Sequence, residues 1–117
     1  MKTNFEYDAR VYDVYDGDTF KAEVDLGFGV KINQTFRLFG CDTPEMRGEE
    51  REQGIIVRDY VRSLILDEQI IIKTHKDKTG KYGRYLAEVT CTNESGGQIH
   101  LANHLMGLDM ATELTYK

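Results

Sequence analysis

The clearest pattern along the chain is an alternation of apolar and polar residues over the segment 19–25. The apolar residues of this segment fall on one face: Phe20, Ala22 and Val24. A period of two predicts a half-buried strand. Segment 10–15, rich in β-branched and aromatic residues, predicts a strand before it, and segment 31–39 predicts one after it. The short turn signals between these segments predict an antiparallel meander.

The pattern changes in segment 49–66, where apolar residues recur at helical spacing. They are Ile56, Val57, Tyr60, Val61, Leu64 and Ile65. This spacing predicts an amphipathic helix whose charged outer face, including Arg58 and Arg62, is solvated. Segments 70–74 and 84–90 predict a fourth and a fifth strand. Segment 99–106 predicts a short second helix that ends at Gly107, and segment 108–117 has no clear pattern.

Five strands with a helix between the third and the fourth define the expected fold class. It is mostly β with α, a five-stranded Greek-key barrel of the oligonucleotide-binding (OB) class whose helix closes one end. The 117 residues show no internal repeat and no linker, so we expect residues 1–117 to form a single domain.

The net charge of −5 limits the partners that the chain can bind. A protein that coats nucleic acid draws its affinity from neutralising phosphates and is usually basic. This chain is expected to handle phosphates only locally, through a bound cation and a few arginines. No apolar run approaches the ~18 residues of a membrane span, and residues 1–8 have no apolar signal core, so we expect no membrane partner, no export signal and a cytoplasmic protein.

Cysteine and histidine give weaker signals. Cys41 and Cys91 are expected to be reduced, buried thiols rather than a disulfide. His100 and His104 stand four residues apart, which would place both on one face of a helix, but the sequence offers no evident third zinc ligand. We assign no catalytic role to these two residues or to His75.

Acidic residues follow two of the predicted strands, at Asp18 and at Asp42. If the first hairpin packs beside the third strand, both carboxylates come together, and facing carboxylates require a cation or raised pKa values. Oxygen ligands favour calcium or magnesium, with the backbone carbonyl near Thr43 and waters completing the shell. Glu45 would face the same cavity, where a general base sits. Taken singly, Asp18 is also an ordinary turn residue and Glu45 an ordinary exposed glutamate.

Two arginines lie on strands that neighbour these carboxylates, Arg37 and Arg84. A guanidinium group binds phosphate oxygens in a bidentate manner and stabilises the charge that grows in the transition state. Lys81 and Tyr82 precede Arg84 in a polar segment and are candidates to hold a second phosphate or a base. The simpler interpretation of that segment is a solvated turn.

These residues occur in an order and spacing that resemble the staphylococcal nuclease (thermonuclease) family. The similarity extends over about residues 9–106 and rests on three motifs in succession. They are Asp16-Gly17-Asp18-Thr19, then Phe36-Arg37-Leu38 followed by Asp42-Thr43-Pro44-Glu45, then Lys81-Tyr82-Gly83-Arg84.

The resemblance implies a calcium-dependent endo- or exonuclease that cleaves DNA and RNA with little sequence preference and leaves 3′-phosphate ends. It implies Ca²⁺ ligands at Asp18 and Asp42 and at the carbonyl of Thr43. Arg37, Glu45 and Arg84 would be catalytic. The remaining implied roles are substrate contacts at Lys81, Tyr82 and Tyr116, and support of the calcium site by Asp16.

The sequence departs from the family pattern in three places. Gly80 stands where the family often has an acidic residue, and Tyr116 stands alone where the family has a tyrosine pair. The long final helix of the family has no counterpart before Lys117, so we expect either a self-sufficient barrel or a homo-oligomer that covers the bare surface. Two other functions stay open, a non-catalytic module that binds nucleic acid or protein, and a structural barrel with an incidental charge cluster.

Overall fold

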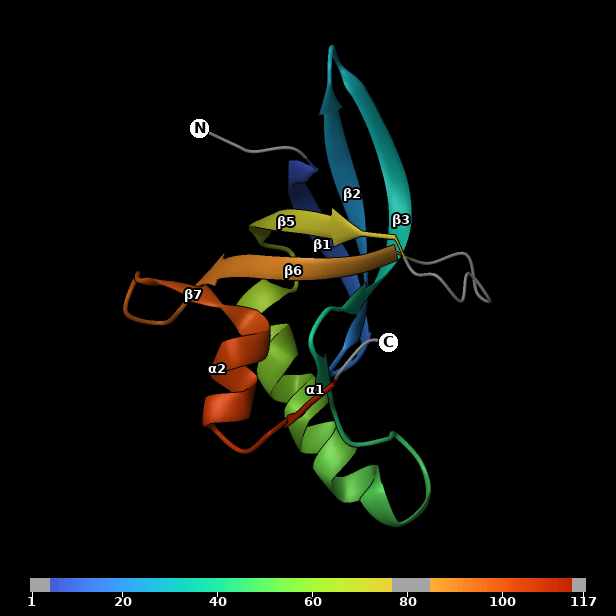
Figure 1. The fold of residues 1–117 in the computed structure, drawn as a ribbon, viewed down its shortest axis with the longest axis vertical. Coiled ribbons are helices and arrows are strands. Elements are labelled where there is room, and N and C mark those ends of the chain that lie inside the picture. The colour runs from blue at the N-terminus through green and yellow to red at the C-terminus, as the bar shows by residue number, and fades with distance from the viewer. Residues whose placement is uncertain (1–4, 77–84, 115–117) are drawn as a thin grey trace.

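The computed structural model describes residues 5–76 and 85–114. Five strands form a closed barrel in the order β3-β2-β1-β5-β6, and a parallel pairing of β3 with β6 closes it (Figure 1). The strands are β1 (Glu6–Asp16), β2 (Thr19–Gly27), β3 (Val30–Leu38), β5 (Gln69–His75) and β6 (Tyr85–Thr92). The fold is therefore mostly β with an OB-like barrel, as the sequence predicts.

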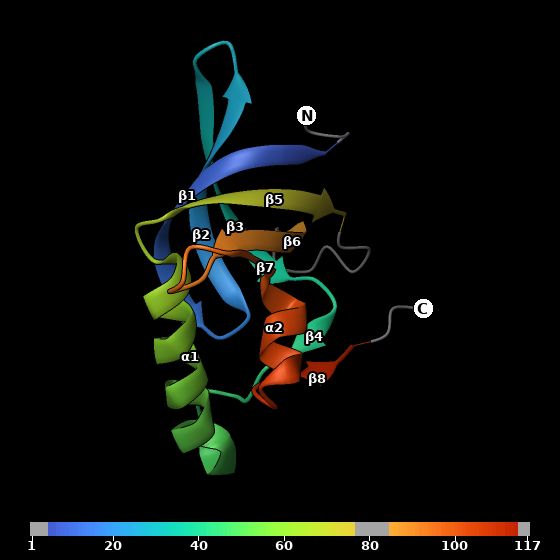
Figure 2. The same cartoon turned by 90° about the vertical axis from the view of Figure 1, so that its left-hand side faces the viewer.

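The remaining elements lie at the lower end of the barrel and beside β6. They are β4 (Cys41–Asp42), the 3₁₀ turn η1 (Gly48–Glu50), α1 (Arg51–Ile65), β7 (Gln98–His100), α2 (Leu101–Gly107) and β8 (Thr112–Glu113). Figure 2 shows α1 and α2 side by side beneath the strands. Helix α1 follows β3 and β4 and precedes β5, so the helix expected between the third and fourth barrel strands is present.

The core fills the barrel and the space between it and the two helices. The alternation in β2 has the predicted outcome, since Phe20, Ala22 and Val24 are buried and their neighbours are not. Helix α1 contributes Val57, Val61, Leu64 and Ile65, and α2 contributes Leu101, Ala102 and Leu105. Cys41 and Cys91 are buried, free thiols as expected, and burial raises the pKa of each, to about 12 for Cys41 and about 11 for Cys91.

Both predicted helices differ from the observed ones at their N-terminal ends. The segment before Arg51 is a 3₁₀ turn, and α1 begins at Arg51 rather than at residue 49. Helix α2 begins at Leu101 because Ile99 and His100 pair with β6 as strand β7. His100 therefore precedes the helix, so the prediction that it shares a helical face with His104 is wrong.

One charged residue of α1 is not solvated in the way the sequence suggests. The side chain of Arg62 donates two hydrogen bonds to the backbone carbonyl of Val14, from Nε at 3.1 Å and from Nη2 at 2.9 Å. Arg62 therefore links α1 to β1 by hydrogen bonds. The sequence alone predicts an exposed charge at this position. None of the helices in residues 5–76 and 85–114 is long and apolar enough to cross a membrane.

The hairpin of β2 and β3 extends past the barrel. The pairing of β1 with β2 ends at Ala9 and Val24, whereas β2 and β3 stay paired as far as Gly27 and Val30. The hairpin rises above the other strands in Figure 1 as a two-stranded ribbon. We call this projecting part, residues 25–32, the arm.

Candidate metal and phosphate site

The turn between β1 and β2 lies beside the end of β3. Thr19 is paired with Arg37 in the β2–β3 ladder, and the backbone N–H of Leu38 donates to the carbonyl oxygen of Asp18 at 2.8 Å. The antiparallel meander thus brings Asp18 next to the segment that carries Arg37 and Asp42. This is the juxtaposition that the sequence predicts for the two strand ends.

Arg37 joins the two carboxylates. Its Nη2 atom lies 2.9 Å from Oδ1 of Asp42 and 3.6 Å from Oδ2 of Asp18. Phe36 and Leu38, on either side of it, are buried in the core, so the arginine side chain extends from the opposite face of β3. One cationic group therefore lies between two anions on different segments of the chain.

Asp18 is the most buried charged residue of the described structure, with 7% of its surface exposed. Its Oδ2 accepts from the backbone N–H of Thr43 at 3.2 Å, and its Oδ1 accepts from the Thr19 hydroxyl at 3.4 Å. Burial is the largest cause that raises its pKa to about 6, followed by a hydrogen bond with Asp16 and the charge of Asp16. The Thr43 N–H and the charge of Arg37 act in the opposite direction.

Asp16 supports the turn that presents Asp18. Its Oδ1 accepts from the backbone N–H of Asp18 at 3.0 Å, which closes an Asx-type turn. Gly17 lets this turn pack tightly, because a Cβ atom there would come within 2.6 Å of Cγ1 of Val57 and 2.8 Å of Oγ1 of Thr43. Asp16 therefore fixes the backbone of Asp18, and its support of a calcium site stays a prediction.

Glu45 lies on the segment between β4 and α1. Its backbone N–H donates to Oε2 of Glu50 at 2.9 Å, while its side chain is 66% exposed and lies 3.8 Å from Nε of Arg47. Gly54 of α1 contacts the backbone here, since a Cβ atom at Gly54 would come within 2.8 Å of the carbonyl carbon of Glu45. Glu50 and Gly54 thus hold the Glu45 backbone and leave its carboxylate open to solvent.

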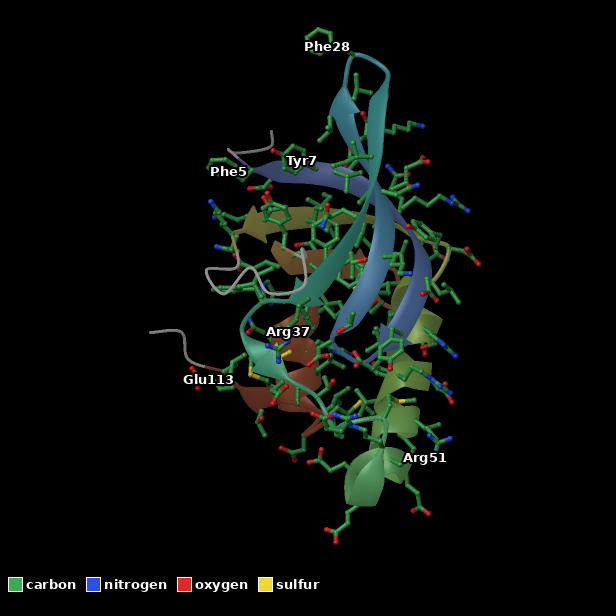
Figure 3. All side chains as sticks on the ribbon, turned by 90° about the vertical axis from the view of Figure 1, so that its right-hand side faces the viewer. Phe5, Tyr7, Phe28, Arg37, Arg51 and Glu113 are labelled. Atoms are coloured by element: carbon green, nitrogen blue, oxygen red, sulfur yellow. The ribbon has the colours of Figure 1, made fainter. Side chains whose placement is uncertain are left out.

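A cleft of about 180 Å³ connects Asp42 with Glu45. It is lined by Asp42, Thr43, Pro44, Glu45, Glu50, Asp109, Met110, Ala111 and Thr112. The last of these residues belong to the segment that follows α2, where β8 pairs antiparallel with β4, with Asp42 opposite Thr112. The backbone N–H of Leu114 also donates to the carbonyl of Gly40 at 3.1 Å. Figure 3 labels Arg37 and Glu113 at this end of the barrel, where Glu113 is paired with Cys41.

The donor set suits a hard cation. Two carboxylates lie within 4 Å of one cationic nitrogen, that of Arg37, and carboxylate oxygens are ligands that Ca²⁺ and Mg²⁺ prefer. The buried Oγ1 of Thr43, beside the same turn, has no hydrogen-bond partner among the described residues. Within the described residues no three His, Cys, Asp or Glu side chains cluster closely enough to hold a metal alone, so a bound ion would also need carbonyl, water or substrate oxygens.

Several expected site residues, the catalytic Arg84 and three substrate contacts, lie outside the described residues. They are Lys81, Tyr82, Arg84 and Tyr116. Strand β6 begins at Tyr85, the residue after Arg84, and in it Tyr85 is paired with Phe36 and Leu86 with Arg37. Their assigned roles stay predictions.

The three histidines make side-chain contacts away from this site. Glu88 bridges two of them, with Oε2 2.7 Å from Nε2 of His75 and Oε1 3.1 Å from Nε2 of His100. These contacts lower the pKa of Glu88 and outweigh the opposing effect of burial. His104 Nε2 lies 2.7 Å from the hydroxyl of Tyr60 and joins the two helices.

Sequence reasoning missed the residues that hold the backbone of the site residues in place. Glu50 and Gly54 lie within a helical pattern in which neither stands out, and Gly17 looks like a common turn glycine. Their roles emerge only from three-dimensional contacts, those of Glu50 and Gly54 with the Glu45 backbone and those of Gly17 with the side chains of Val57 and Thr43. When compared with models of protein families and with curated proteins, the sequence matches none of them.

Proposed function

We propose that this protein is a calcium-dependent phosphodiesterase of the staphylococcal nuclease type, which hydrolyses DNA and RNA with little sequence preference. The observation that carries the proposal is the convergence of Asp18 and Asp42 on the guanidinium group of Arg37. Asp42 also lines a cleft together with Glu45. Carboxylates, an arginine and an exposed general base are the groups that phosphoryl transfer to water requires.

Asp18 and Asp42 are the residues that would hold calcium, with the carbonyl oxygen of Thr43 as a further ligand. When bound, the ion supplies positive charge beside the phosphate and favours the extra negative charge of the transition state. Asp16 contributes indirectly, because its hydrogen bond fixes the backbone of Asp18.

Glu45 and Arg37 are the side chains that act on the water and on the phosphate. The Glu45 carboxylate takes a proton from the attacking water, whose oxygen forms a bond to phosphorus. The bond from phosphorus to the 5′ oxygen breaks and that oxygen takes a proton from solvent water, which leaves a 3′-phosphate and a 5′-hydroxyl group. Arg37 exchanges its carboxylate partners for the non-bridging phosphate oxygens and donates to them as their charge grows. Arg84 is the expected second donor.

A digestion assay tests the proposal. Supercoiled plasmid and a single-stranded RNA are incubated with the protein in calcium, in magnesium and in excess chelator. We expect cleavage in calcium, loss of cleavage with chelator, and loss of cleavage in Arg37→Ala. Arg58→Ala is the matched control, since Arg58 lies on α1 and pairs with Asp59. Undiminished cleavage in chelator would reject the calcium role, and binding without cleavage under every condition would favour the non-catalytic module.

A further inference from the structure

The arm has apolar side chains that no described part of the chain covers. Beyond Val24 the strand β2 is paired only with β3, so residues 25–32 form a two-stranded ribbon. Such a ribbon is marginally stable in water unless its apolar face packs against something. The apolar side chains of this arm are all exposed: Leu26, Phe28, Val30 and Ile32.

Phe28 at the tip of the arm is the most exposed large apolar residue described, at 106% of its reference surface. Its φ of 56° is in the left-handed region, between Gly27 at 86° and Gly29 at 76°. A bulky side chain rarely adopts that conformation, because its Cβ atom comes too close to the following carbonyl oxygen. The hairpin thus carries an aromatic side chain, at some cost, where turns usually carry Asn, Asp or Gly.

An apolar groove lies where the arm leaves the barrel. It has a volume of about 310 Å³ and is lined by Phe5, Tyr7, Val24, Leu26, Ile32, Gln34, Phe36, Thr74 and Tyr85. None of these lining residues is charged. Figure 3 shows Phe5 and Tyr7 near this mouth of the barrel, with Phe28 apart from them at the tip of the arm. The tip is therefore separated from the groove of its own chain.

We propose that a second copy of this chain occupies the groove, with Phe28 of each protomer inserted into the groove of the other. The exchange is reciprocal, so it closes as a two-fold symmetric dimer. A nucleic-acid occupant fits less well, because the described residues that line the groove include no lysine or arginine for phosphates and the chain carries a net charge of −5. This inference does not depend on the proposed nuclease activity.

The exposed apolar surface is large enough to matter. The exposed parts of Phe5, Phe28 and Tyr85 together amount to about 400 Å² per chain, taking about 200 Å² for each fully exposed aromatic side chain. A standard interface buries ~800 Å² per partner, and the aliphatic residues of the arm add to the aromatic share. This surface is divided between the tip and the groove of each chain, and a reciprocal exchange would bury both parts.

Sedimentation velocity of the full chain over a range of concentrations tests the proposal. We expect a reversible dimer for the wild type, and a dissociation constant weakened by about 100-fold or more in Phe28→Asp and in Phe5→Asp. Both variants should fold, because each position has a left-handed φ that Asp tolerates better than Phe and each side chain is largely exposed. Ile56→Gln is the control, since Ile56 is an exposed apolar residue (52%) on α1.

Mixing the two variants separates a specific exchange from general stickiness. Phe28→Asp keeps an intact groove and Phe5→Asp keeps an intact tip, so an equimolar mixture restores one of the two contacts. We expect the mixture to form a heterodimer at concentrations at which each variant alone is monomeric. Isotope labelling of one variant with ¹⁵N identifies the heterodimer by NMR.

Three results would overturn the proposal. They are a wild-type protein that stays monomeric to about 1 mM, a Phe28→Asp variant that dimerises as well as the wild type, and a mixture that fails to associate. A monomer whose Phe5 and Tyr85 resonances shift on addition of a thymidine oligonucleotide would assign the groove to nucleic acid instead.

Discussion

A Cβ atom on Gly54 would lie 2.8 Å from the carbonyl carbon of Glu45. Helix α1 therefore touches the backbone of the residue proposed to activate water, and only the absence of a side chain allows this approach. The contact joins the helix that closes the barrel to the cleft that would receive the phosphate. The position of Glu45 thus depends on a residue nine positions along the chain that bears no functional group.

Gly54→Ala should destabilise the protein in spite of the higher helix propensity of alanine. Overlap with the Glu45 backbone is expected to cost about 1–3 kcal/mol, against a propensity gain of up to ~1 kcal/mol. Urea unfolding followed by circular dichroism measures the net change. Gly107→Ala is the matched control, because a Cβ atom at Gly107 of α2 would meet no other atom within 4 Å, so this variant should be neutral or slightly stabilised. Equal stability of the two variants would contradict the close contact.

Glu45→Gln should remove turnover without unfolding the protein. Loss of the general base is expected to lower the cleavage rate by about 10²–10⁴-fold. The side chain is 66% exposed, so the free energy of unfolding should change by less than ~0.5 kcal/mol. Initial rates on plasmid DNA in calcium, together with a thermal melt, measure both effects. Glu49→Gln, in the neighbouring 3₁₀ turn, should keep full activity. A fully active Glu45→Gln would disprove the assigned role.

Asp18→Asn should stabilise the calcium-free protein at neutral pH. The folded pKa of Asp18 is raised to about 6 from 3.8, so the folded state holds its proton more tightly than the unfolded state. Its favourable contribution is complete below about pH 4 and is lost as the pH rises through 6. The pKa shift corresponds to about 3 kcal/mol of stability that the wild type loses when Asp18 ionises. Asparagine does not ionise, so the variant keeps this stability. We expect the variant to be more stable than the wild type at pH 8 and to lose that advantage at pH 3.5.

If Asp18 is a calcium ligand, added calcium should favour the stability of the wild type over that of Asp18→Asn. Millimolar calcium should raise the melting temperature of the wild type and leave that of Asp18→Asn nearly unchanged, because only the ion-binding protein gains stability from the ligand. Differential scanning calorimetry at pH 8, with and without chelator, measures both. Equal calcium shifts in the two proteins would remove Asp18 from the site.

Arg62→Ala should destabilise the fold more than removal of a typical surface arginine. The two hydrogen bonds from Arg62 satisfy the carbonyl of Val14, whose residue is fully buried. An unsatisfied buried carbonyl costs about 1–3 kcal/mol. Arg58→Ala, which breaks a pair with Asp59 on the same helix, should cost less than ~1 kcal/mol. Chemical denaturation of both variants decides whether Arg62 has a structural role.

The sequence predicts the barrel well where one face is buried. The alternation around Ala22 and the helical spacing around Val61 come from burial on one side, and such periodicity is readable in a single chain. It predicts less where an element depends on its partner. Strand β8 is two exposed residues that acquire a strand conformation only by pairing with β4, and no local pattern identifies it.

For the site, the sequence predicts which charges meet but not how they are held. The turn signal at Asp18 and the end of β3 are local features, so their juxtaposition follows once the meander is assumed. The ion pair of Arg37 with both carboxylates, and the capture of the Glu45 N–H by Glu50, depend on side-chain geometry across segments. Periodicity and propensity contain no information on such contacts.

The pairing of β8 with β4 also affects when the candidate site is completed during synthesis of the chain. During synthesis the barrel strands β1 to β6 emerge before residues 112–113, so Asp42 lacks its strand partner until most of the sequence has left the ribosome. In a nascent chain with a nearly complete barrel, Asp42 would lack the strand pairing that fixes its backbone. On the proposed nuclease function, the cleavage site would be completed late in synthesis, after most of the chain has passed the ribosomal RNA.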